Sequence, residues 1–486
     1  MHSPLYKQLL IVTLLLIVPF LDSFHLPIRI KLPTSLDSQS EDTDSSSQLS
    51  RRQVGELTIA SLGGLLTLQG TSTRTKSDYP LWGILPVGPY KRKKTIISTI
   101  VPDKIWTLDQ KFGILNVQVP LRMTVVALSD GGLLIYNPLA CTEELQDLLA
   151  PIIEQFGQPK HIVLGTVALE HKVYAGVFAQ KYPKAIVYLQ PGQYSSPLNL
   201  PDTFLGFPVG RTKPIPTDSS SCPWSKEFST YQLGPFISRD GCYSECVLFH
   251  PSTKTLLVTD CVLEVDQKVP EIFNDDPAPL LYHARDKVTD VVEDSPETRL
   301  RGWRRVALFG LFFQPSSIVI EEADAAYAQR RPDINPDFLG VYPWTWVEPE
   351  TKSFDAITNG LLVAPILQKL ILSRYPIQTL DFADAISSLP IERIIPCHFG
   401  NDLKYSGADF RRAFSFLEEG GVKKGPRPRP EDFKQLEDAE TSLLESGAIA
   451  PAPPMPGSMG VTREDIIKAT EARCRKGICS QSAVST

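Results

Sequence analysis

Residues 161–171 read HIVLGTVALEH, and this stretch decides how the whole chain is interpreted. The apolar run from His161 to Leu164 predicts a short buried strand. Glu170 and His171 follow in the loop after that strand and begin a predicted helix. Because small molecules and ions bind at the carboxyl ends of strands in α/β sheets, these two side chains are candidates for a binding site.

Two later strands also end in a side chain that binds metals. Residues 256–260 read LLVTD and place Asp260 directly after an apolar run. Residues 394–400 read IIPCHFG and place His398 at the end of another apolar run. Two imidazoles and two carboxylates at one edge of a sheet can hold a single Zn, Fe or Mn ion. The sequence therefore predicts one metal centre made from Asp260, His398 and the preceding pair Glu170-His171.

The rest of the pattern is that of an α/β protein. Apolar strands alternate with helical segments in the first half, as at Glu143–Phe156, where leucine and isoleucine recur at helical spacing. Asp130-Gly131-Gly132 predicts a hairpin turn. Later segments are expected to form a loop at 192–235, an insertion at 264–345 with a helix near Arg301–Phe313, and helices at about 355–374 and 379–388.

Length and composition exclude several classes of protein. At 486 residues the chain exceeds one average domain of about 100–200 residues. A net charge of −6 and a pI near 5.8 argue against a nucleic-acid binder with a basic surface. Eight cysteines do not make a disulfide-dense scaffold. A mean hydropathy of −0.07 excludes a polytopic membrane protein.

The N-terminal region is expected to be a targeting sequence. The apolar run Leu9–Leu21 is shorter than a bilayer span of about 20 residues and predicts a signal peptide over 1–23, with a membrane anchor as the alternative. Phe24 after the cleavage point resembles presequences of complex algal plastids. Arg51-Arg52 precedes a second apolar run within the region 24–76, which is typical of twin-arginine export or of a first domain helix. We expect a plastid protein, with the thylakoid lumen as a candidate compartment within the plastid and secretion as the alternative.

The ordered motifs resemble the metallo-β-lactamase-like hydrolase superfamily. LEH after the first strand, the strand ending in TD and the late IIPCHFG look like its metal-binding loop, its bridging-Asp strand and its Pro-x-His-Gly segment. More closely, four motifs over roughly residues 79–420 resemble a plant, algal and cyanobacterial family, the domain of unknown function 4336. These motifs are WTLDQ at 106–110, VPLRM at 119–123, DGGL at 130–133 and YNPL at 136–139.

The resemblance implies a four-layer αβ/βα sandwich of the metallo-β-lactamase type with a helical insertion. The Pro-rich composition of residues 421–486 separately predicts a flexible tail. The sequence departs from the superfamily at its first metal position. Alignment on LEH puts Thr166 and Ala168 where the superfamily has histidines, and Leu189 or Gln190 where it has a third. The resemblance therefore implies that the first metal is lost.

The second metal position is kept by Glu170, His171, Asp260 and His398. An ion with an open coordination position lowers the pKa of bound water to about 7, and Glu170 or Asp260 can act as general base. The chain is then a mono-metal hydrolase of an ester, a thioester or a phosphoester. The alternative is a non-catalytic relative that binds a small ligand or a protein partner through the same cleft.

The cysteines leave two alternatives open. Cys261 and Cys397 each adjoin a predicted ligand, and Cys242 and Cys246 lie one strand earlier. Buried free thiols are expected, and disulfides in an oxidising compartment are the alternative. The basic-aromatic helix near 301–313 is expected to belong to the core rather than to a membrane surface. The sequence contains no phosphate-binding Gly-rich loop and no Ser nucleophile elbow.

Overall fold

The computed structural model describes residues 76–77, 87–88, 93–114, 116–193, 202–238, 241–335 and 340–475. The predicted signal peptide and nearly all of the predicted targeting region lie outside these residues. The strands are β1 Val87–Gly88, β2 Ile96–Val101, β3 Ile105–Ile114, β4 Val117–Ala127, β5 Leu133–Tyr136, β6 Pro159–Leu164, β7 Ile186–Leu189, β8 Thr212–Pro214, β9 Ser229–Ser238, β10 Gly241–His250, β11 Thr255–Leu257, β12 Ile318–Ile320, β13 Trp344–Trp346 and β14 Arg393–Ile395. The α-helices are α4 Glu143–Phe156, α5 Leu169–Lys181, α6 Ala278–His283, α7 Pro296–Phe312, α8 Ala323–Ala328, α9 Thr351–Asp355, α10 Pro376–Ser387, α11 Gly407–Ala413, α12 Lys434–Glu445 and α13 Arg463–Arg475.

Two sheets form the centre of the molecule. The larger has the strand order β1-β3-β4-β5-β6-β7-β8, with β2 also paired to β3, and the smaller has the order β14-β11-β10-β9. The first strands of the larger sheet run antiparallel, and β5 to β8 run parallel. In the smaller sheet only β11 and β14 are parallel. A parallel pair needs a long connection, and here the helical insertion and α10 supply it.

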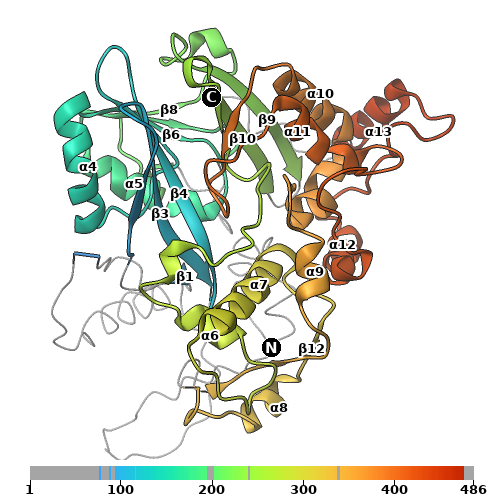
Figure 1. Cartoon of the computed structure of the whole chain (residues 1–486). Coiled ribbons are helices and arrows are strands. Elements are labelled where there is room, and N and C mark those ends of the chain that lie inside the picture. Colours follow the sequence, from blue (N-terminus) through green and yellow to red (C-terminus); the bar gives the residue numbers. More distant parts are fainter. Residues whose placement is uncertain are drawn as a thin grey trace, which may run out of the picture.

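Alternating side chains divide the sheets into layers, because successive residues of a strand point to opposite faces. On β5, Leu134 and Tyr136 pack in a core shared with Leu248 of β10 and Ile395 of β14. Leu133 and Ile135 point the other way, into the core beneath α4 and α5. The far face of the smaller sheet packs on α7 and α10. Figure 1 shows α4 and α5 beside the larger sheet and α10 and α11 beside the smaller one. The predicted αβ/βα sandwich is confirmed.

The predicted hairpin and insertion helix are confirmed. Gly131 and Gly132 have φ of 81° and 82°, a left-handed conformation open to glycine at no steric cost, and β4 returns as β5 from this turn. Helix α7 buries Trp303, Arg305 and Val306, so it is a core helix as expected. None of the described helices combines the length and the apolar character needed to cross a bilayer.

Two local expectations were wrong. Residues 229–238, expected within or beside a loop, form β9, which pairs along β10 from Ser229 to Ser238. The helix expected over about 355–374 is broken after α9, because Asn359 and Gly360 have positive φ. The chain regains helical turns only as a π-helix at Leu367–Ile371 and a 3₁₀ turn at Leu372–Arg374.

The C-terminal segment is not the free tail that its composition predicted. Leu436 of α12 is fully buried in the largest core. Asp432 is fully buried and accepts hydrogen bonds from the backbone N–H and hydroxyl of Ser316, at 2.9 and 2.6 Å, and from the Ser353 hydroxyl at 3.1 Å. Pro-rich composition limits local structure, but these long-range contacts attach residues 430–445 to the domain.

Candidate metal centre

The four predicted ligands meet. Glu170, His171, Asp260 and His398 each offer one ligand atom, and these atoms all lie within 4.8 Å of one another. We refer to these four residues as the ligand cluster. In the described part of the chain, His171 is fully buried, whereas Asp260 and His398 keep 17% and 12% of their side-chain surface exposed. The cluster is therefore anchored inside the protein and reachable from solvent on one side.

Strand register explains why two distant residues become neighbours. Leu257 of β11 pairs with Ile395 of β14 in parallel, and Asp260 and His398 each come three residues later in their own segment. The Cys397 N–H continues the pairing by donating to the Thr259 carbonyl at 3.2 Å. Both segments therefore leave the sheet side by side, which brings Nε2 of His398 to 3.3 Å from Oδ1 of Asp260.

His398 is oriented through its other ring nitrogen. Its Nδ1 lies 3.1 Å from the Pro120 carbonyl, so Nδ1–H donates there and Nε2 faces Asp260. Metal-binding histidines usually make this second hydrogen bond. Burial disfavours the imidazolium of His398, but the Asp260 carboxylate outweighs burial and raises its pKa. Burial likewise opposes ionisation of Asp260, yet the imidazoles of His171 and His398 hold the pKa of its carboxyl well below its usual range.

His171 is the buried member of the cluster. It lies in the first turn of α5, and its ring meets the ring of His398 edge to face at a centroid distance of 5.2 Å. Nε2 is 3.9 Å from Oδ1 of Asp260. Neither ring nitrogen has a hydrogen-bond partner among the described residues. A buried polar group without a partner is costly, and a cation between these side chains would satisfy one of the two nitrogens.

The spacing of the donor atoms fits a cation. Ligands at about 2.1 Å from a tetrahedral ion lie roughly 3.4 Å apart. The ligand atoms of Asp260 and His398 are already at 3.3 Å, and the upper limit of 4.8 Å exceeds the ideal spacing by about 1.4 Å. Nitrogen and carboxylate donors in this number suit Zn, Fe or Mn. These residues can therefore hold one such ion.

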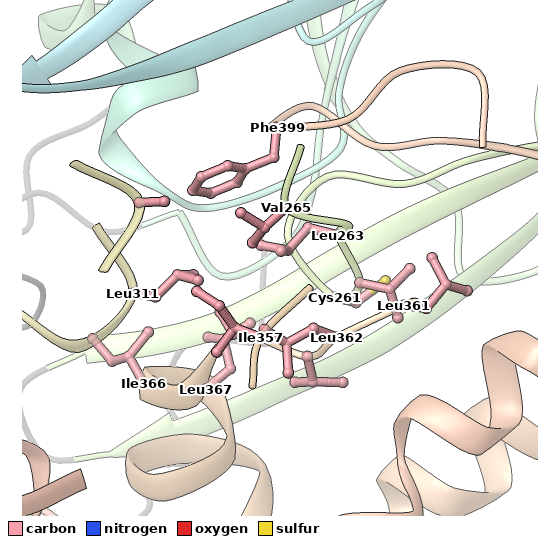
Figure 2. Close-up of a cluster of buried hydrophobic side chains, with 14 of the residues drawn as sticks. Cys261, Leu263, Val265, Leu311, Ile357, Leu361, Leu362, Ile366, Leu367 and Phe399 are labelled. Atoms are coloured by element: carbon pink, nitrogen blue, oxygen red, sulfur yellow. The ribbon is translucent and has the colours of Figure 1, made fainter. Parts of the chain in front are cut away.

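Hydrophobic neighbours fix the two ligand-bearing loops. Cys261 follows Asp260 and Phe399 follows His398, and both side chains lie in the core cluster of Figure 2. The thiols of Cys246, Cys261 and Cys397 are free and buried, as are those of Cys141 and Cys222, and Cys242 is free and half-buried. The expectation of buried free thiols is confirmed for Cys246, Cys261 and Cys397, whereas Cys242 is free but only half-buried.

Arg122 holds the His398 loop from the larger sheet. Its guanidinium donates to the carbonyls of Pro396, Gly400 and Phe399 at 2.7, 2.9 and 2.9 Å. Its backbone N–H donates to the Cys397 carbonyl at 2.7 Å. Arg122 belongs to the VPLRM motif of the sequence, so part of that motif serves to fix this loop.

The structure adds a residue that the sequence analysis missed. Glu245 of β10 is fully buried, and its carboxylate accepts hydrogen bonds from the backbone N–H groups of Thr259, Asp260 and Cys261 at 2.7, 3.0 and 2.9 Å. Burial and the nearby Asp260 charge raise the pKa of Glu245 to about 7. One signal was available in the sequence, since a lone Glu interrupts an apolar strand of GCYSECVLFH.

The residues at the lost first position contact protein groups instead. Thr166 is fully buried, and its hydroxyl accepts the Ala168 N–H at 3.1 Å. Gln190 is also buried and donates to the hydroxyl of Ser244. Leu189 packs in the core under α5. This set has hydroxyl and amide groups in place of imidazoles, so it lacks the donors of a second metal site.

The sequence comparison identifies a family whose matched region spans this site. Residues 102–416 match the family described as a domain of unknown function (DUF4336). The chain belongs to this family. The matched region contains all four members of the ligand cluster, together with Arg122 and Glu245. No curated protein has a matching sequence.

Solved structures with a similar arrangement include flavodiiron proteins and metallo-β-lactamases. A metal-soaked Flv1 flavodiiron core from Synechocystis is 8% identical, with a TM-score of 0.34, over 66% of this chain and 60% of that one. A metallo-β-lactamase from Pontibacter korlensis is 14% identical, with a TM-score of 0.27, over 54% of this chain and 98% of that one. A flavoprotein from Thermotoga maritima is 10% identical, with a TM-score of 0.34, over 67% and 61%. This chain thus spans less than two thirds of the Flv1 core.

Proposed function

We propose that this DUF4336 protein is a mono-metal hydrolase that acts on an ester, a thioester or a phosphoester. The observation that carries the proposal is the convergence of Glu170, His171, Asp260 and His398 within 4.8 Å. Two features support metal binding over simple ion pairing. The ring nitrogens of His171 have no hydrogen-bond partner among the described residues, and Nδ1 of His398 faces a carbonyl so that Nε2 is left for a cation.

The residues divide into holding and proton-accepting roles. A Zn, Fe or Mn ion held here would supply Lewis acidity and lower the pKa of a bound water to about 7. His171 and His398 are the neutral donors of the site. Glu170 and Asp260 are each partly exposed, so either carboxylate can accept a proton from an attacking water. The buried loops behind them keep these groups in place during the reaction.

Metal content tests this proposal. The full chain, purified without chelators, is expected to contain about one equivalent of Zn, Fe or Mn by elemental analysis. His171→Ala and His398→Ala should each lose the metal. Glu170→Gln should lower the rate of hydrolysis of model esters more than it lowers the metal content. His283→Phe serves as control, because His283 is a fully buried imidazole outside the cluster. A metal-free wild-type protein, or unchanged metal in His171→Ala, would contradict the proposal.

A second candidate function is non-catalytic binding of a small ligand or a protein partner. One observation favours it: Thr166, Ala168 and Gln190 replace the first metal position with groups that contact other protein atoms. Under this alternative, His171→Ala and His398→Ala keep both the fold and the partner. Affinity capture from extracts with wild-type and variant proteins separates the two candidates, since the metal-dependent function requires both imidazoles.

We also propose a plastid location, with the thylakoid lumen as the final compartment. The support is the signal-like run at 9–21, Phe24 after it, and Arg51-Arg52 before a second apolar run. A fluorescent fusion to residues 1–76 should enter plastids, and Arg51→Lys with Arg52→Lys should stop it outside the lumen. Secretion of the fusion would overturn this location.

A further inference from the structure

We infer that Glu245 is a positioning residue that aims the Asp260 carboxylate at the cation. The inference rests on the proposed metal site, because it concerns how one of its ligands is held. Glu245 itself offers no atom to the ligand cluster. It acts instead on the backbone of the loop that follows β11.

The Glu245 carboxylate accepts hydrogen bonds from three successive residues of that loop. Oε1 accepts the Thr259 N–H, and Oε2 accepts the N–H groups of Asp260 and Cys261. The Tyr243 hydroxyl adds a fourth hydrogen bond, to Oε2 at 3.0 Å. Three successive backbone N–H groups therefore point at one side chain. This fixes the direction in which the Asp260 side chain leaves the backbone.

The same stretch of β10 also fixes the other ligand-bearing loop. Glu245 forms a backbone bridge with Thr166. The Cys246 N–H donates to the Gly165 carbonyl at 2.7 Å, and the Val167 N–H donates to the Ser244 carbonyl at 3.3 Å. The loop so held leads directly to Glu170 and His171. Glu245 and its strand neighbours thus contact two of the three loops that carry the ligand cluster.

Replacement of Glu245 by glutamine keeps its size and removes one acceptor. A glutamine amide has one oxygen and one NH₂ group, and the NH₂ group cannot accept a hydrogen bond. In either orientation of the amide, at least one loop N–H loses its acceptor and faces another donor. Because a buried unpaired donor is costly, the loop is expected to shift and to move Asp260. Loss of such an outer contact typically weakens metal affinity by about 10–100-fold.

Cobalt binding to the full chain, followed by visible absorption, tests the inference. We expect Glu245→Gln to bind Co²⁺ about 10–100-fold more weakly than wild type and to change the ligand-field bands. Glu245→Asp, which keeps two acceptor oxygens, should recover part of the affinity. Asp432→Asn is the matched control, since Asp432 is an equally buried carboxylate with three hydrogen bonds that lie outside the cluster. All three bonds go to Oδ1, which asparagine keeps as its amide oxygen, so that variant should leave the fold, the cobalt affinity and the spectrum unchanged.

The outcomes separate this inference from the proposed function. Failure of wild type to bind cobalt overturns the metal site and the inference together. Cobalt binding by wild type with equal affinity and spectrum in Glu245→Gln overturns the inference alone. If Glu245→Gln does not fold, Glu245→Asp decides, because the shorter side chain withdraws both oxygens from the three loop N–H groups. A cobalt spectrum and affinity identical to wild type in Glu245→Asp would then reject the role of Glu245.

Discussion

The buried Arg122 and the partly exposed Asp109 form an ion pair in which Nη2 of the guanidinium donates to Oδ2 of the carboxylate at 3.0 Å. Nε also faces Asp109, at 2.8 Å from Oδ1, while Nη1 and the second N–H of Nη2 hold the segment that carries His398. Both residues come from adjacent antiparallel strands, where Asp109 is the direct partner of Arg122. The larger sheet therefore supports a residue of the ligand cluster that is attached to the smaller sheet.

The first prediction concerns this pair. Arg122→Gln should lower the free energy of unfolding by about 3–5 kcal/mol, because it leaves Asp109 without its buried partner. Denaturant unfolding measures the change. Arg331→Gln is the control, since Arg331 and Asp333 form an exposed pair whose loss should change stability little. An equal effect of both substitutions would show that Arg122 has no special structural role.

A second prediction concerns the C-terminal segment. Leu436→Ala should cost about 2–5 kcal/mol of unfolding free energy, because Leu436 is fully buried and its truncation leaves a cavity. Met459→Ala, at a side chain that is 98% exposed, should have no measurable effect. Thermal unfolding of the two variants compares them. A wild-type melting temperature for Leu436→Ala would mean that α12 does not stabilise the domain.

The third prediction concerns acid stability. Burial, together with the charges of Arg305 and Arg285, lowers the pKa of His283 to about 3. The unfolded chain, with a histidine pKa of about 6.5, therefore binds the proton first as pH falls. Protonation of His283 in the unfolded chain should therefore lower the free energy of unfolding as the pH falls from 6.5 toward 3. At pH 4.5, removal of the imidazole should raise the free energy of unfolding by roughly 2–3 kcal/mol.

His283→Phe tests the size and sign of this effect. The imidazole stacks on Trp344 at 5.5 Å, and a phenyl ring can take that place. The variant should gain stability relative to wild type as pH falls from 7 to 4.5, as measured by urea unfolding at both values. A difference that does not vary with pH would show that His283 is not the titrating group.

A fourth prediction concerns thiol reactivity. Cys246, Cys261 and Cys397 are almost completely buried, and burial raises the pKa of each thiol. A thiol reagent should therefore leave these three unmodified in the native protein and react with them after denaturation. Mass spectrometry of labelled peptides assigns the sites. Disulfide-linked peptides containing any of the three would contradict the structure.

The ligand cluster could be predicted because its signal is local and chemical. Each of three strands ends in a residue of a type that binds metals, and the order of these motifs also suggested the fold. Glu245 could not be placed in this way, because its role depends on which backbone N–H groups the loop after β11 presents to it. A buried Glu in a strand is visible in the sequence, whereas its partners are not.

The errors have a similar cause. Residues 229–238 contain Gly and Pro, which disfavour a strand locally, yet β10 provides a partner along their length. The C-terminal segment contains many prolines, but Leu436 and Asp432 find buried partners far away in the chain. Composition reports on local preference, and in both segments tertiary contacts decide the outcome.

The pairing of β11 with β14 has a consequence for biosynthesis. Asp260 emerges from the ribosome well before His398, and the insertion with α7 and the helices up to α10 must be made in between. A nascent chain thus lacks one of the four side chains of the ligand cluster until β14 docks, so the site that we propose for the cation forms only after most of the domain has been made.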